Sequence, residues 1–75
     1  MKFKKGEFVV LKPELENKDI HRIYVVENFK EPTKEEDLNL ELSIFDEKPL
    51  TRKGEKSKLM GKILKGESKD FIPYM

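Results

Sequence analysis

The chain has 75 residues and a formal net charge of +1, with 16 basic and 15 acidic side chains and no cysteine. This length suits one domain, residues 1–75, with a small core, because a chain this short buries only roughly 60% of its unfolded surface. The lack of cysteine excludes a disulfide framework, a thiolate metal site and a cysteine nucleophile. We therefore expect a cytoplasmic protein. We expect no small-molecule ligand either, because an enclosed cavity takes volume from the core.

Charged residues make up 41% of the chain and hydrophobic residues 36%. The apolar residues nevertheless come in clear runs, which favours a folded domain over a disordered chain. The run behind the basic N-terminus, Phe8–Leu11, is shorter than the about 7–15 residues of a signal-peptide core. No segment approaches the roughly 20 apolar residues of a membrane helix, so we expect no membrane association.

The first two apolar runs predict strands. Residues 7–12 are β-branched and aromatic, and they lie between Gly6 and Pro13, as in a strand entered from a turn. A polar loop follows at residues 14–19. Residues 21–29 form the strongest strand pattern in the chain, with apolar groups on both faces, as in a central or strongly curved strand.

The third run has the most regular alternation. Residues 38–45 place apolar side chains on one face and polar side chains on the other, which predicts a strand with one buried face and one wet face. The apolar positions are Leu38, Leu40, Leu42 and Ile44, and the polar positions are Asn39, Glu41 and Ser43. Before this run, residues 33–37 have the Thr-x-x-Glu spacing of a capping box, which predicts one helical turn or a loop.

The last third of the chain is less regular. Residues 46–57 contain one apolar side chain, Leu50, and predict an extended loop. Residues 58–65 predict the fourth strand, in which Gly61 indicates a bulge or bend. Pro73 is expected to prevent normal strand pairing of residues 71–74, which should plug one end of the sheet as an irregular or 3-10 segment. The sequence therefore predicts an all-β antiparallel barrel of four to five strands with a short helical or 3-10 turn.

Residues 5–12, with the sequence KGEFVVLK, resemble the opening of SH3-like small β-barrels. These barrels often begin with a basic residue, a glycine, an acidic residue and an alternating apolar strand. The order of the later elements also resembles this group, and it resembles short uncharacterised proteins of bacteria, phages and mobile elements. The resemblance implies an SH3-like barrel that binds RNA, DNA, peptides or proteins. Residues 14–19 contain no Tyr or Trp, so a proline-rich ligand is not expected.

The sequence contains no recognisable catalytic or metal-binding set. His21 is the only histidine, and the serines lack the spacing of a nucleophile elbow. We interpret His21 as an ordinary imidazole at a strand edge. The acidic residues 35–37 lack the spacing of a calcium loop, and the four glycines are too dispersed to cradle a phosphate. We expect a protein that is not an enzyme and that uses no metal or other cofactor.

Charge is unevenly distributed along the chain. Residues 35–47 contain six acidic and no basic side chains, whereas residues 48–65 contain seven basic side chains and one acidic side chain, Glu55. The two blocks either screen each other and keep the protein soluble, or expose a basic patch that binds phosphates or an acidic partner. The candidate basic patch comprises Lys48, Arg52, Lys53, Lys56, Lys58 and Lys62. The candidate acidic patch comprises Glu35, Glu36, Asp37 and Glu41.

Two binding functions remain open. The first is a small interaction or accessory protein that docks on a protein partner, or on a second copy of itself, through its charged surface. The alternative is nucleic-acid binding through residues 48–65, with Phe45 and Tyr74 stacking on bases. A net charge of +1 is low for a nucleic-acid-binding domain. In so small a chain we expect both of these rings in the core.

Overall fold

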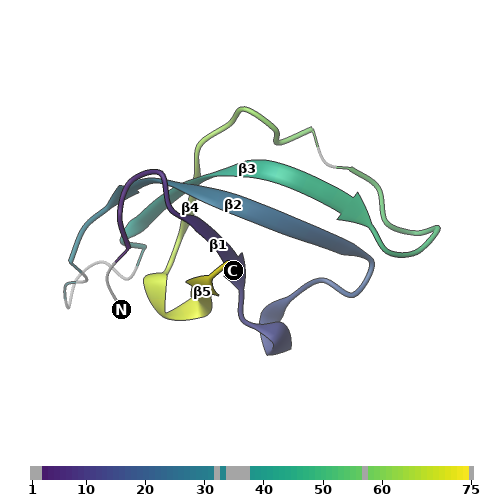
Figure 1. The fold of residues 1–75 in the computed structure, drawn as a ribbon, viewed down its shortest axis with the longest axis horizontal. Coiled ribbons are helices and arrows are strands. Elements are labelled where there is room, and N and C mark those ends of the chain that lie inside the picture. Colours follow the sequence, from purple (N-terminus) through teal and green to yellow (C-terminus); the bar gives the residue numbers. More distant parts are fainter. Residues whose placement is uncertain (1–2, 32, 34–37, 57, 75) are drawn as a thin grey trace.

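Two long strands, β2 and β3, form the centre of a five-stranded antiparallel sheet (Figure 1). The computed structural model describes residues 3–31, 33, 38–56 and 58–74. The strand order in the sheet is β4-β3-β2-β1-β5. The strands are β1 (Phe8–Leu11), β2 (Ile20–Phe29), β3 (Leu40–Pro49), β4 (Leu64–Gly66) and β5 (Phe71–Pro73). In the described part of the chain, the helical segments are two 3-10 turns, η1 (Pro13–Leu15) and η2 (Ser68–Asp70).

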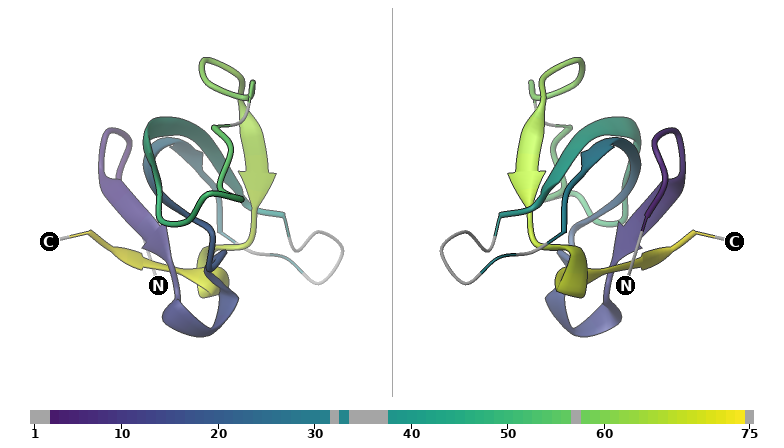
Figure 2. Two further views of the ribbon diagram at one scale, coloured as in Figure 1. Left: turned by 90° about the vertical axis from the view of Figure 1, so that its right-hand side faces the viewer. Right: turned by 90° about the vertical axis from the view of Figure 1, so that its left-hand side faces the viewer.

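The sheet curls into a half-barrel, as the side views show (Figure 2). β2 and β3 pair along their whole length, but the pairing register shifts between Ile23 and Tyr24 and again between Val26 and Asn28. An extra residue on one strand bends that strand and increases its twist. The two shifts therefore curve the central hairpin around the core. The predicted all-β antiparallel fold with 3-10 turns is confirmed.

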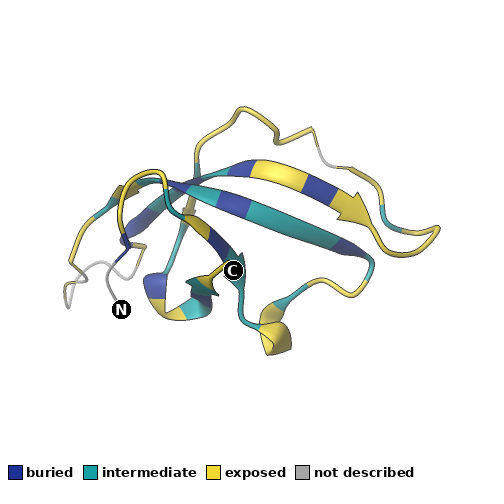
Figure 3. Cartoon of the chain, viewed as in Figure 1, coloured by how far each residue is buried: buried dark blue, intermediate teal, exposed yellow. Residues whose placement is uncertain are grey.

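The inner face of the half-barrel holds the hydrophobic core, and buried positions alternate along β2 and β3 (Figure 3). The buried cluster contains Phe3, Val9, Tyr24, Val26, Leu40, Leu42, Ile44 and Phe71. The predicted alternation of residues 38–45 is confirmed for the three apolar positions that lie within β3. It is wrong for Leu38, which is 49% exposed because the strand begins only at Leu40.

Asn39 is buried, although its place in the alternation predicts a wet position. Its Nδ2 donates to the carbonyl oxygen of Lys30 (2.8 Å) and to Oγ of Ser68 (3.0 Å). Its Oδ1 accepts a bond from the backbone N–H of Ser68 (3.0 Å). Burial of this amide is tolerated because each polar atom has a partner. Asn39 thus joins the ends of the central hairpin to the turn η2.

β3 is longer than predicted. Its residues 46–49 pair with residues 20–23 of β2, so the charged loop begins at Leu50 and not at Asp46. The exposed side chains of Asp46 and Lys48 do not prevent strand formation here, because a sheet with one solvated face accepts them.

β4 is shorter than the predicted strand over residues 58–65. The N–H of Lys62 donates to the carbonyl oxygen of Leu59 (3.0 Å), and Gly61 has a φ of +83°. This left-handed conformation favours glycine, which lacks a Cβ. Residues 59–62 therefore form a turn, and pairing with β3 begins only at Leu64.

Pro73 does not prevent pairing of the C-terminal segment. β5 pairs antiparallel with β1, with Pro73 opposite Val9 and Phe71 opposite Leu11. A proline is tolerated there because β5 is an edge strand, where the missing N–H can face away from the sheet. The predicted irregular plug is thus a strand, and the 3-10 turn lies directly before it. The helical turn or loop predicted for residues 33–37 lies, except for Thr33, outside the described residues.

Candidate functional site

All six residues of the candidate basic patch are exposed. Lys48 lies near the end of β3. The others lie in the loop between β3 and β4, residues 50–63, which runs back above β3 in the view of Figure 1. The predicted basic residues therefore lie in the loop between β3 and β4 and at the end of β3. We call residues 50–63 the basic loop.

The beginning of the basic loop is fastened to the connection between β1 and β2. The N–H of Leu50 donates to the carbonyl oxygen of Asp19 (2.8 Å), and Oγ1 of Thr51 donates to the Asp19 carboxylate (3.0 Å). Gly54 passes so close to Asp19 that a Cβ there would lie 2.0 Å from the Asp19 carbonyl oxygen. The turn that carries Arg52 and Lys53 is thus held in place by backbone and side-chain contacts with Asp19.

The basic loop also exposes apolar side chains. Leu50 is 54% exposed, Met60 50% and Ile63 54%, and Leu59 is 38% exposed. Exposed apolar groups that gather between charged residues are typical of surfaces that bind other molecules. The apolar surface at Leu59, Met60 and Ile63 was not predicted from the sequence, because residues 58–65 were predicted to form a strand.

The acidic patch is only partly described, because Glu35, Glu36 and Asp37 lie outside the described residues. Glu41 is half-buried on β3, pairs in register with Lys65 of β4, and accepts a weak hydrogen bond from Nδ2 of Asn28 (3.5 Å). Glu41 is therefore placed beside a basic residue of the same sheet.

Glu47 belongs to the same acidic block, but it is buried inside the protein. Its side chain is 1% exposed, and Nε of Arg22 donates to Oε1 of Glu47 (2.9 Å). Burial lowers the pKa of Arg22, but the hydrogen bonds and charges supplied by Glu47 and Tyr24 outweigh burial and raise this pKa above its ordinary value. The guanidinium therefore stays charged beside the buried carboxylate, and Glu47 does not contribute to a surface patch.

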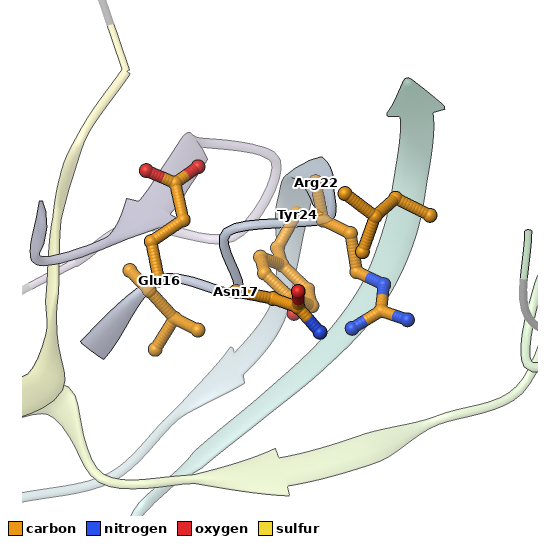
Figure 4. Close-up of a pocket in the computed structure, with 6 residues that line it drawn as sticks. Glu16, Asn17, Arg22 and Tyr24 are labelled. Atoms are coloured by element: carbon orange, nitrogen blue, oxygen red, sulfur yellow. The ribbon is translucent and has the colours of Figure 1, made fainter. Parts of the chain in front are cut away.

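His21 has a carboxylate partner, because its Nδ1 lies in hydrogen-bonding contact with Oε1 of Glu16. The two side chains border an open groove of about 460 Å³ lined by Pro13, Glu16, Asn17, Lys18, His21, Lys48 and Leu50. A smaller cavity of about 10 Å³ lies nearby, between Glu16, Asn17, Arg22 and Tyr24 (Figure 4). That volume holds about one water molecule. The described residues contain no group of three or more potential metal ligands.

Phe45 and Tyr74 lie outside the core, so the prediction that both rings are buried is wrong. Phe45 is 58% exposed and Tyr74 48%. The Phe45 ring packs on the ring of Phe8, with centroids 4.7 Å apart. The N–H of Tyr74 donates to the carbonyl oxygen of Phe8 (2.9 Å), which places Tyr74 beside Phe8 at the edge of the sheet.

These rings belong to the outer face of the sheet. Val9 is fully buried, and side chains alternate along a strand, so its neighbours Phe8 and Val10 point outward. Residues directly opposite in an antiparallel pair share a face, so Val25 and Ile72 point outward with them. We call this surface the aromatic face, and it comprises Phe8, Val10, Val25, Phe45, Ile72 and Tyr74. The sequence signal that could have predicted the aromatic face is the alternation of side chains along a strand. Phe8 and Val10 flank Val9, and Phe45 follows Ile44, so these neighbours point away from the core.

In the described part of the chain, no helix combines the length and the apolar character needed to cross a membrane. Comparison with protein-family models, with curated proteins and with solved structures finds no match to this chain.

Proposed function

We propose that this chain is a non-enzymatic binding module of the cytoplasm that docks on a protein partner through its charged surface, chiefly the basic loop. The observation that carries the proposal is the composition of the exposed loop, in which Leu59, Met60 and Ile63 lie among five basic residues. The resemblance of residues 5–12 to SH3-like barrels supports it, because members of that group bind proteins and peptides.

The mixture of charge and apolar surface suits a protein partner. Complementary charges steer encounter and set the register of a complex, and apolar anchors provide the buried centre of an interface. Met60 is suited to such an anchor, because a methionine side chain adapts to irregular surfaces. The fixed start of the loop at Asp19 limits the backbone freedom that binding must remove there.

The test compares two charge-reversal variants of the tagged chain, expressed in its own cells, for the proteins that they capture. The loop variant is Lys56→Glu/Lys58→Glu/Lys62→Glu. The control is Lys4→Glu/Lys5→Glu/Lys30→Glu, which changes the net charge equally at exposed sites outside the loop. We expect the wild type and the control to retain the same partner and the loop variant to lose it by at least about tenfold. A captured set that is the same for all three proteins would show that the basic loop is not the docking surface.

Nucleic-acid binding is the second candidate, and the exposure of Phe45 and Tyr74 favours it because bases stack on exposed rings. The test titrates a labelled single-stranded oligonucleotide with the protein and follows fluorescence anisotropy. Binding through the basic loop should weaken steeply with added salt and disappear when Arg52, Lys53, Lys56 and Lys58 are changed to Glu. Binding that survives this fourfold change, or no binding at about 50 mM salt, would eliminate this candidate.

A further inference from the structure

The aromatic face is an exposed apolar surface on a very small domain. Phe45, Tyr74 and Phe8 are 58%, 48% and 39% exposed, and they lie beside half-buried aliphatic side chains of the same face. Soluble monomers rarely leave large contiguous apolar surfaces in water, and a continuous one marks an interaction site.

The aromatic face has acidic neighbours. Oγ of Ser43 donates to Oε1 of Glu27 (2.8 Å), and Ser43 lies opposite Val25 of the aromatic face. Asp46 is exposed and directly follows Phe45. A partner that covers the aromatic rings therefore needs apolar side chains in its middle and basic side chains at its margin.

The turn at residues 58–63, part of the basic loop, has this composition. It exposes Leu59 and Met60 between Lys58 and Lys62, and Ile63 directly after Lys62. Its conformation is set by the bond from Lys62 N–H to Leu59 and by the positive φ of Gly61. A single chain thus carries two apolar surfaces with neighbouring charges of opposite sign.

Within one copy the turn leaves the aromatic face uncovered. It leads into β4, which pairs with β3, the strand that carries Phe45, whereas Phe8 and Tyr74 lie on and beside β1 and β5 toward the opposite edge of the sheet. Phe45 is nevertheless 58% exposed, and Tyr74 and Phe8 are 48% and 39% exposed. The rings therefore remain open to a second molecule.

We propose that the partner of this module is a second copy of the same chain, in which the turn of each copy packs on the aromatic face of the other. Leu59, Met60 and Ile63 cover the exposed rings, and Lys58 and Lys62 face Glu27 and Asp46. A twofold dimer uses both contacts at once and leaves neither surface exposed. This inference rests on the proposed function, because it assigns the partner of the basic loop.

Sedimentation velocity of the purified chain tests the inference. We expect a monomer that converts to a dimer between about 10 µM and about 1 mM protein at low salt, and a weaker dimer at about 0.5 M salt, because salt screens exposed charges. A chain that stays monomeric at the highest concentration and lowest salt would overturn the inference. If that chain still captures a different partner through the basic loop, the proposed function stands without it.

A charge exchange identifies the surfaces. The turn variant Lys58→Glu/Lys62→Glu and the face variant Glu27→Lys/Asp46→Lys should each lose the dimer by at least about tenfold in Kd. An equimolar mixture of the two variants should recover it, because each acidic turn then meets a basic face and each basic turn an acidic face. Recovery also proves that both variants fold. The control Lys4→Glu/Lys5→Glu should dimerise like the wild type. A dimer that neither variant weakens, or that the mixture fails to restore, contradicts this arrangement.

Discussion

The buried amide of Asn39 offers the sharpest test of the fold, and Asn39→Ala is the change to make. The wild-type side chain is 7% exposed and makes three hydrogen bonds, two of them to Ser68, which is itself buried. Alanine removes all three bonds. The backbone N–H and Oγ of Ser68 then remain buried without the hydrogen bonds to Asn39.

The magnitude follows from these groups. A buried donor or acceptor without a partner costs about 1–3 kcal/mol, so the two Ser68 groups together should cost about 3 kcal/mol. A chain of this length has a total stability of about 4–11 kcal/mol, at about 0.05–0.15 kcal/mol per residue. The loss is therefore a large share of the total, and it should lower Tm by about 12–24 °C.

Urea unfolding followed by circular dichroism measures this loss as a shift of the midpoint at constant slope. The matched control is Asn28→Ala, whose exposed amide makes one long bond to Glu41 and should change stability by less than about 0.5 kcal/mol. Because Asn39 and Ser68 form one network, Asn39→Ala/Ser68→Ala should cost less than the sum of the two single changes. If Asn39→Ala unfolds at the wild-type urea concentration, the buried network does not hold the hairpin to η2, and our reasoning is wrong.

Two further predictions concern the core. Leu42→Ala truncates a residue that is 2% exposed and should lower the free energy of unfolding by about 2–5 kcal/mol. Leu38→Ala, at a position that is 49% exposed, should change it by less than about 0.5 kcal/mol. Equal losses for the two variants in urea unfolding would contradict the strand boundary at Leu40. Arg22→Met removes a partner from the buried carboxylate of Glu47 and should cost about 3–5 kcal/mol. The double change Arg22→Met/Glu47→Leu should restore part of this loss in the same assay, and a double variant less stable than Arg22→Met would show that the buried charge of Glu47 is not the cause of the loss.

The strand pattern could be read from the sequence wherever alternation of side chains is local. Leu40, Leu42 and Ile44 repeat with a period of two, and each is buried as that period requires. The same period places Phe45 on the outer face. The prediction that this ring lies in the core, made because large rings in a short chain are usually buried, is wrong. Here the geometry of the strand outweighs the tendency of a large ring to be buried, because the inner face is already filled by its neighbours.

The basic loop has one feature that the sequence predicts, its charge, and one that the sequence does not predict, its length. Its charges could be read from the sequence, and all six candidate residues are exposed. Its length could not, because β3 continues to Pro49 only through pairing with β2, and β4 is shortened by the turn at Gly61. Propensity along the chain does not specify where a distant strand supplies hydrogen bonds.

The sequence by itself determined the β class, the approximate places of the first three strands and the division of charge, because each depends on the kind and spacing of neighbouring residues. Only the tertiary structure decided that Asn39 is buried, that Pro73 lies in a paired edge strand, and that Phe8, Phe45 and Tyr74 share one outer face. These features depend on residues far apart in the chain, brought together by a sheet whose register shifts curl it around its core.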